Sequence, residues 1–199
     1  MPSTAERVAA ALEAVPRAAF LPPGQRAAVE RDEPLAIGHG QTNSQPTTVR
    51  QMLELLDVQP GDRVLDVGSG SGWTTALLAH LTGPGGRVTG VERVPELVTF
   101  GAANLAAIGR PWARVVPAVP GHLGLPTEGP YQRILVSAQA TTLPDELVDQ
   151  LAPGGVLVIP VAGRMLLVRA HDGGPAVEEH GWYRFVPLVA DPPDEPQVD

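Results

Sequence analysis

The residues whose types and spacing most clearly suggest chemistry lie between positions 64 and 92. A short apolar run, Val64 to Val67, carries one acid at Asp66 and is followed by Gly68-Ser69-Gly70-Ser71-Gly72. Glycines let a backbone approach a ligand closely, and a helix that starts directly afterwards offers free N–H groups. Glu92 follows Gly72 by 20 residues, the usual place for a carboxylate that binds a ribose diol. The spacing therefore predicts a nucleoside-type ligand.

The same loop argues against a dinucleotide as that ligand. The fingerprint G-x-G-x-x-G needs a third glycine where this chain has Trp73, so a pyrophosphate is not expected. We interpret Trp73 as helix core and not as a substrate platform. Asp66 is expected to belong to the site, in part by orienting the amides of the loop. A plain strand-to-helix turn would explain the glycines alone, but not the glycines together with Asp66 and Glu92.

Apolar runs and glycine-rich turns alternate from residue 63 onward, which predicts alternating strands and helices. Strands are predicted over 63–67, 87–92, 113–118, 133–136 and 156–161, and helices over 73–81, 95–108 and 143–151. Two late strands, 165–170 and 184–188, are expected to pair antiparallel around Asp172-Gly173-Gly174, and Pro153-Gly154-Gly155 is expected to close the helix 143–151. The predicted fold is α/β, with a doubly wound, mostly parallel Rossmann-like sheet, helices on both faces and an antiparallel C-terminal strand pair.

The N-terminal part of the chain has a different pattern. Helical spacing predicts helices over 4–15 and 47–57, and the residues between them are rich in proline, glycine and polar side chains. Long irregular segments of this kind are usually functional. We expect one domain over 1–190, in which 1–57 form a helical and loop extension on the substrate side. The Pro- and acid-rich tail 191–199 is expected to be disordered.

Composition excludes several chemistries. The chain has 199 residues, no cysteine and no lysine, so its 14 basic residues are all arginine. A disulfide framework, a thiolate zinc site, a cysteine nucleophile and a Schiff-base lysine are therefore excluded. The net charge of −8 and the absence of a dense basic run disfavour nucleic acid as a partner. The five histidines lack ligand spacing, so no metal site is expected.

The chain shows no signal peptide and no apolar run long enough to span a bilayer. Glu13 interrupts the stretch where a signal peptide would be apolar, and the apolar run 151–163 is broken by prolines and glycines. We therefore expect a soluble cytoplasmic protein without a membrane partner, and we expect it to be a monomer.

The stretch from Asp66 to Gly72 with Glu92 resembles the nucleotide-binding half of class I S-adenosylmethionine-dependent methyltransferases. More narrowly, residues 5–189 resemble the protein-L-isoaspartate O-methyltransferase family. The segments that carry this resemblance are Val15-Pro16-Arg17 with Phe20, Ile37 to Pro46, Pro60 to Leu65, Leu123 to Pro126, Pro153 to Gly155 and Arg184 to Leu188. The segment Gly38 to Pro46 is the most specific, because the glycine loop alone identifies only the superfamily.

The resemblance implies S-adenosylmethionine as the cofactor and isoaspartyl-containing proteins or peptides as the substrate. It places the active-site serine at Ser44. The positions that match the family's cofactor contacts are Gln41, Thr42, Asn43, the loop Gly68 to Gly72, Glu92 and the pair Pro120 and Gly121.

The sequence departs from the family pattern at three places. The family's Gly-Asp-Gly, whose aspartate faces the adenine end of the cofactor, is matched here by Val119-Pro120-Gly121. Gln132 stands at a position where aspartate is common, and Val189 at one that is often threonine. This chain is therefore a divergent relative with its own adenine contacts.

The implied reaction is methyl transfer to the side-chain carboxylate of an isoaspartyl residue, whose ester then cyclises to a succinimide. A carboxylate is already ionised at neutral pH, so no general base is needed, and we interpret His39 as structural. Ser44 would orient the carboxylate by one hydrogen bond. From the residues alone, the better interpretation of Ser44 is the N-cap of the helix 47–57, and only the resemblance favours the catalytic role.

Two other functions stay open at this point. One is a dedicated methyltransferase for an aspartate in a single peptide, as a tailoring step in biosynthesis. The other is a degenerate cofactor-binding homologue without activity, which the missing aspartate at Pro120 would explain.

Overall fold

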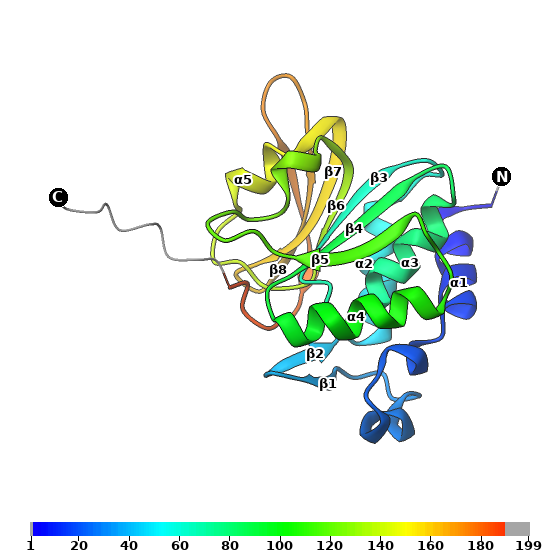
Figure 1. The fold of residues 1–199 in the computed structure, drawn as a ribbon. Helices are drawn as coiled ribbons and strands as arrows, with labels where there is room; N and C mark the ends of the chain where they lie inside the picture. The colour runs from blue at the N-terminus through cyan, green and yellow to red at the C-terminus, as the bar shows by residue number, and fades with distance from the viewer. Residues whose placement is uncertain (1, 190–199) are drawn as a thin grey trace.

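A seven-stranded sheet runs through the middle of the molecule in the order β5-β4-β3-β6-β7-β8-β9 (Figure 1). The computed structural model describes residues 2–189. Five strands of this sheet are parallel: β3 (Arg63–Val67), β4 (Arg87–Glu92), β5 (Ala113–Pro117), β6 (Tyr131–Val136) and β7 (Leu151–Val161). The last two, β8 (Arg164–Arg169) and β9 (Ala176–Trp182), continue the sheet by antiparallel pairing.

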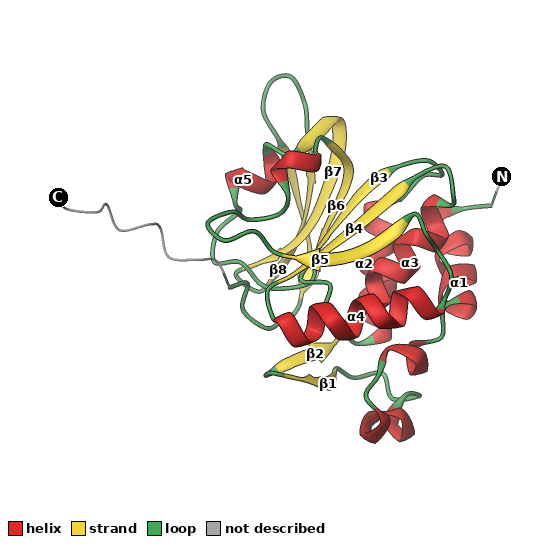
Figure 2. Ribbon diagram, in the orientation of Figure 1, coloured by secondary structure: helices red, strands yellow, loops and turns green. Residues whose placement is uncertain are grey.

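Helices cover both faces of the sheet (Figure 2). On one face lie α1 (Thr4–Ala14), α2 (Pro46–Leu56), α3 (Trp73–Thr82) and α4 (Pro95–Ala107). On the other lies the short α5 (Asp145–Val148), together with the segment around the 3₁₀ helix Pro126–Glu128. This arrangement confirms the predicted doubly wound α/β fold with an antiparallel strand pair at one edge.

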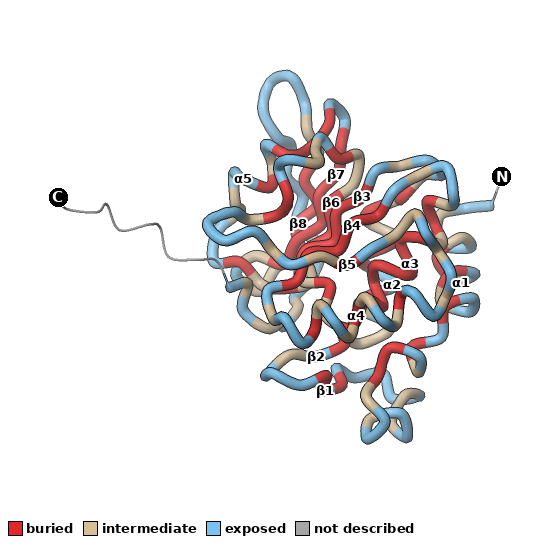
Figure 3. Tube along the Cα trace, in the orientation of Figure 1, coloured by how far each residue is buried: buried red, intermediate tan, exposed pale blue. Residues whose placement is uncertain are grey.

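Alternation along the strands divides the core between the two faces. Val64, Leu135 and Val158 pack with the four-helix face, whereas their neighbours Leu65 and Ile134 pack with α5. Successive side chains of a strand point to opposite faces, so an apolar strand buried on both sides must contribute to two cores. Figure 3 shows that the inner strands of the sheet are buried, in contrast to the edge strands β5 and β9.

The chain changes direction in the sheet at β3. It runs from β3 outward to β5 and then returns to β6 on the other side of β3. The carboxyl ends of the strands at such a switch point leave a crevice, which is where doubly wound sheets bind ligands. Val67, Glu92 and Val136 are the last residues of β3, β4 and β6, so the crevice lies where the sequence places its chemistry.

The C-terminal strand pair differs in part from the prediction. β8 matches the predicted strand 165–170, but its partner is β9 (Ala176–Trp182) and not 184–188. β9 is an exposed edge strand that carries Glu178 and Glu179, so it has no apolar periodicity to reveal it. Segment 184–188 is apolar for another reason: it crosses the strand ends, where the backbone of Gln139 bonds Val186 and Leu188.

The predicted helix 143–151 is also shorter than expected. Helix α5 ends at Val148, and Leu151 already pairs with Tyr131 as the start of β7. The next pair is Arg133 with Val156, so residues 152–155 of β7 bulge out of the ladder. Pro153-Gly154-Gly155 therefore lies inside this irregular strand and does not close a helix.

The segment 16–46 is built of several short elements. It contains 3₁₀ helices Arg17–Phe20 and Pro23–Ala28 and a hairpin of β1 (Leu35–Gly38) and β2 (Gln41–Asn43). None is longer than six residues, which explains why the sequence shows no period there. Helices α1 and α2 share the core of the sheet. The division of the chain into a domain and an N-terminal extension stays a prediction, and the predicted disordered tail lies outside the described residues.

No helix within residues 2–189 is both long and apolar enough to cross a bilayer.

Candidate active site

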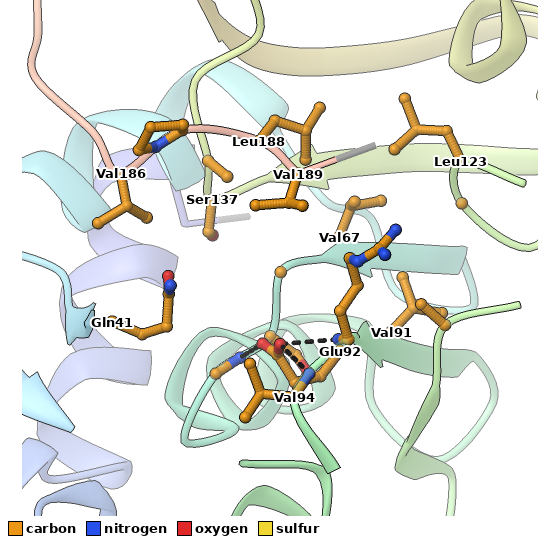
Figure 4. A pocket seen from close by; sticks show the side chains of 18 of the residues that line it. Gln41, Val67, Val91, Glu92, Val94, Leu123, Ser137, Val186, Leu188 and Val189 are labelled. Atoms are coloured by element: carbon orange, nitrogen blue, oxygen red, sulfur yellow. Dashed lines mark hydrogen bonds between the residues drawn. The ribbon is translucent and has the colours of Figure 1, made fainter. Parts of the chain in front are cut away.

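A cavity of about 630 Å³ lies at the carboxyl ends of β3, β4 and β6. In Figure 4, Gln41 reaches in from the hairpin, Glu92 lies on the glycine-loop side, and Val186, Leu188 and Val189 form the opposite wall. The volume is typical of small-molecule sites, which span roughly 300–1,000 Å³. Most of the predicted site residues line it: Gln41, Thr42, Asn43, Ser44, Gly68, Ser69, Gly70, Ser71, Glu92 and Gly121. Asp66, Gly72 and Pro120 do not line the cavity.

The glycine loop is fixed to the end of β4 through its backbone. The amides of Gly68 and Ser69 both donate to the carbonyl of Val91. Gly68, Gly70 and Gly72 have φ angles of 77°, 52° and 85°, a left-handed conformation that favours glycine. Gly72 serves packing and does not face the cavity, because a Cβ on it would lie 3.0 Å from the carbonyl oxygen of Gly101 in α4.

Glu92 joins the loop to the next strand end. Its Oε2 accepts from the amide of Gly70 at 2.9 Å, and its Oε1 accepts from Arg93 at 2.7 Å and Val94 at 3.0 Å (Figure 4). A carboxylate has about four acceptor positions. Backbone amides therefore use three of these acceptor positions, and about one remains for a ligand hydroxyl. The sequence had predicted that Glu92 would accept from both hydroxyls of a ribose.

Asp66 lies behind the loop, fully buried. Its Oδ2 accepts from the hydroxyls of Thr74 and Thr75, both at 2.7 Å, and its Oδ1 has no partner among the described residues. Burial raises the pKa of Asp66 to about 6, the two hydroxyls oppose the rise, and the charge of Glu92 adds to it. The prediction that Asp66 orients the loop amides is wrong, because its bonds go to the first turn of α3.

Ser44 lines the cavity directly after the hairpin. The N-cap of α2 is Gln45, and the carboxylate of Asp32 accepts from the amide of Thr47 at 2.9 Å. Because the first turn of α2 is satisfied by Asp32, the helix-cap interpretation of Ser44 is wrong. The Ser44 hydroxyl forms no hydrogen bond with another residue of 2–189, so it is free to meet a ligand.

Two other residues have the structural roles expected of them. His39 lies exposed at the hairpin tip with a φ of 54° and does not line the cavity. Trp73 is 3% exposed and belongs to the core on the four-helix face, where its Nε1 donates to the carbonyl of Val15 at 3.0 Å. Trp73 also lines the cavity, so the core role is confirmed, while the expectation that it is no substrate platform stays a prediction.

Several residues that line the cavity were not anticipated. Ser137 follows β6 directly, and the rule that ligands meet the carboxyl ends of parallel strands could have found it. Val186 and Leu188 were hidden by their assignment to a strand. Pro120 is exposed and outside the lining, whereas Ala118 and Gly121 on either side of it belong to the lining. The wall next to Pro120 is therefore formed by its neighbours.

The strand order, the glycine loop after β3 and the acid that ends β4 are the features of a class I nucleotide-binding methyltransferase fold. The family model of protein-L-isoaspartate(D-aspartate) O-methyltransferase matches residues 3–192, and the chain belongs to this family.

Named relatives support this membership. The protein-L-isoaspartate O-methyltransferase of Aeropyrum pernix is 46% identical over 193 residues, which cover 94% of this chain and 74% of that protein. The corresponding protein of Methanopyrus kandleri is 45% identical over 190 residues, which cover 93% and 84%. A crystal structure from Plasmodium falciparum, assigned to the same enzyme and bound to S-adenosyl-L-homocysteine, superposes with a TM-score of 0.82 at 28% identity. It covers 94% of this chain and 91% of that one.

Proposed function

We propose that this protein is an S-adenosylmethionine-dependent carboxyl O-methyltransferase that methylates L-isoaspartyl residues of damaged proteins and peptides. The observation that carries the proposal is a cavity whose lining brings together Ser44, which directly follows the hairpin, the glycine loop and Glu92. The names of the relatives in this family support the same reaction.

The residues of the cavity suit this cofactor. Glu92 retains about one acceptor position for a ribose hydroxyl. The loop glycines allow close approach by a ligand, and Ser69 has a buried hydroxyl without a partner among the described residues. Val91 and Val94 offer apolar surface beside Glu92 for a base (Figure 4). We assign the cofactor to this side and Gln41, Thr42 and Asn43 to its amino-acid end.

The substrate carboxylate needs positioning and not activation. It is ionised at neutral pH and is already a nucleophile. Bound in the cavity, S-adenosylmethionine supplies an electrophilic methyl group whose bond to sulfur breaks, with the electron pair left on sulfur, as its bond to oxygen forms. The Ser44 hydroxyl donates one hydrogen bond to the carboxylate and holds the attacking oxygen in line. A single donor orients the anion while leaving its charge on the attacking oxygen.

A methyl-transfer assay tests the proposal. Radiolabelled S-adenosylmethionine is incubated with matched peptides that contain either isoaspartate or aspartate at one position, in several sequence contexts. The proposal predicts methylation of most isoaspartyl peptides and of no aspartyl peptide. Methylation of the isoaspartyl residue in only one peptide would contradict the proposal. So would the absence of methylation when calorimetry shows that the cofactor binds.

A further inference from the structure

Arg17 is the most highly connected buried charge in the described part of the chain, and it lies outside the cavity. The residue is 5% exposed and begins the 3₁₀ helix that follows α1. Burial lowers the pKa of Arg17, and the charges of Asp32 and Glu33 oppose that shift. A buried guanidinium is costly unless its donors are satisfied, so its partners show what it stabilises.

Every hydrogen bond of Arg17 goes to the segment that carries Ser44. Its Nε donates to Oδ1 of Asn43 at 2.7 Å, and its Nη1 donates to the carbonyl of Arg31 at 3.2 Å. Its Nη2 lies 2.8 Å from the carbonyl of Glu33 and 2.9 Å from those of Asn43 and Ser44. One side chain therefore joins the residues that lead into β1 to Asn43 and Ser44, which end and follow β2.

The same side chain connects this segment to the glycine loop. Asn43, which accepts from Arg17, donates through Nδ2 to the Ser71 hydroxyl at 3.1 Å. Asn43 and Ser71 are 5% and 2% exposed, so this link is shielded from water. The guanidinium also lies 5.6 Å from the ring of Trp73, the first residue of α3.

A second anchor holds the chain on the other side of Ser44. Asp32 accepts from the Thr47 amide and hydroxyl and from Gln45. These bonds, the Thr47 amide first, hold the pKa of Asp32 below its usual range. Ser44 thus lies between carbonyls fixed by Arg17 and a helix start fixed by Asp32, while its own hydroxyl has no bond to restrain it.

We propose that Arg17 is a positioning residue that fixes the backbone of Ser44 against the glycine loop, and so sets the rate of methyl transfer without contacting cofactor or substrate. This inference rests on the proposed function. Lysine keeps the charge but concentrates its three donors on one atom, so it cannot reach acceptors both before β1 and after β2.

The test compares Arg17→Lys with the wild-type chain. We expect kcat to fall at least about tenfold while the dissociation constant of S-adenosylmethionine, measured by calorimetry, changes less than about twofold. Amide hydrogens of residues 43–49 should exchange at least about fivefold faster, and those of α3 at the same rate. Arg26→Lys is the matched control, because Arg26 is exposed and makes one bond, to the carbonyl of Leu21. It should leave all three quantities unchanged.

A double-mutant cycle separates positioning from general destabilisation. If Arg17 acts through Ser44, then Ser44→Ala should lower kcat at least about tenfold in the wild-type chain but less than about twofold in Arg17→Lys. Full additivity, or a folded Arg17→Lys with wild-type kcat, would overturn the proposal.

A second variant covers the case in which Arg17→Lys does not fold. Asp32→Ala removes the exposed carboxylate that caps the start of α2 and should lower kcat by about threefold. The effects of Asp32→Ala and Ser44→Ala on kcat should again not add in the double variant. An unchanged kcat in Asp32→Ala would then count against the proposal. If the wild-type chain methylates no isoaspartyl peptide, the proposed function fails, whereas the exchange rates of residues 43–49 still decide the role of Arg17.

Discussion

The glycine-loop wall of the cavity, Gly68 to Ser71, is tied to the end of β4 by its backbone amides, whereas the hairpin wall, Gln41 to Ser44, is held by the side chains of other segments. On the loop side, the amides of Gly68, Ser69 and Gly70 bond Val91 and Glu92 at the next strand end. On the hairpin side, Arg17 and Asp32 hold the carbonyls and amides around Ser44. Besides its backbone bonds to Val91, the loop wall depends on one side chain, that of Glu92, whereas the hairpin wall depends on two.

The difference matches the task that each wall would perform. The loop wall would bind a cofactor that all members of the methyltransferase class share, so its frame is the sheet itself. On the hairpin wall, Gln41, Thr42 and Asn43 would meet the amino-acid end of the cofactor, whereas Ser44 would orient a particular substrate group. This wall is built from a segment that can vary without altering the sheet. We therefore expect changes on the loop side to alter cofactor affinity or stability, and changes at Ser44 on the hairpin side to alter turnover.

The largest expected effect concerns the buried acid behind the loop wall. The pKa of Asp66 is raised to about 6 in the folded protein, against about 3.9 in an unfolded chain, so the folded state binds the proton more tightly. The contribution of Asp66 to the free energy of unfolding should therefore fall by about 2–3 kcal/mol as pH rises from about 4 to about 7, since one pKa unit corresponds to about 1.4 kcal/mol. Above pH 7 it should stay constant.

Urea unfolding of wild type and Asp66→Asn across this pH range measures that contribution as a difference, so the titration of other carboxylates cancels. The account predicts that Asp66→Asn gains stability relative to wild type as pH rises. If the difference in free energy of unfolding between the two proteins did not change with pH, the pKa of Asp66 would not be raised by folding.

The next effect is on cofactor binding. Glu92→Ala removes the carboxylate that joins the loop to β4 and its one available acceptor position. The loss of a hydrogen bond to a charged group should weaken S-adenosylmethionine binding by about 1.5–3 kcal/mol without unfolding the protein. Calorimetric titration gives the affinity and circular dichroism the fold. Unchanged affinity would mean that the loop wall is not where the nucleoside lies.

A smaller effect is expected beside the loop wall, at Pro120. Proline offers no side-chain acceptor and no N–H, so it cannot replace the contact that an aspartate makes with an adenine amino group. Pro120→Asp should therefore tighten S-adenosylmethionine binding by about 0.5–1.5 kcal/mol, and by less for an analogue without that amino group. A loss of affinity with an intact fold would show that the segment from Ala118 to Gly121 is shaped around the proline.

The contrast between the two walls also explains how much the sequence could predict. The loop wall was predictable because its determinants are local: glycines, the acid of the next strand and the apolar runs of β3 and β4 lie within 30 residues of each other. The hairpin wall was located only through family resemblance. The bonds that hold it join Arg17 to residues as far as Ser44, and nothing in the spacing of those residues indicates a contact.

Elsewhere, the sequence pattern predicted the wrong secondary structure where the polar or apolar character of a segment depends on its tertiary surroundings. Glu178 and Glu179 concealed β9, because an edge strand needs no buried face. Val186 and Leu188 suggested a strand, although they are apolar because they line the cavity. Pro153 to Gly155 suggested a helix end, but a bulge in β7 accommodates them. Each case depends on a tertiary neighbour that local periodicity does not describe.

The most direct test of the division between the walls is Ser44→Ala, measured for turnover and for cofactor affinity in the same preparation. The loss of one hydrogen bond to a charged group should raise the activation free energy by about 1.5–3 kcal/mol, which lowers kcat roughly 10- to 150-fold. The dissociation constant of S-adenosylmethionine should stay unchanged. That result would assign the hairpin wall to the substrate carboxylate. Wild-type turnover, or a loss of cofactor affinity as large as the loss of turnover, would contradict the account.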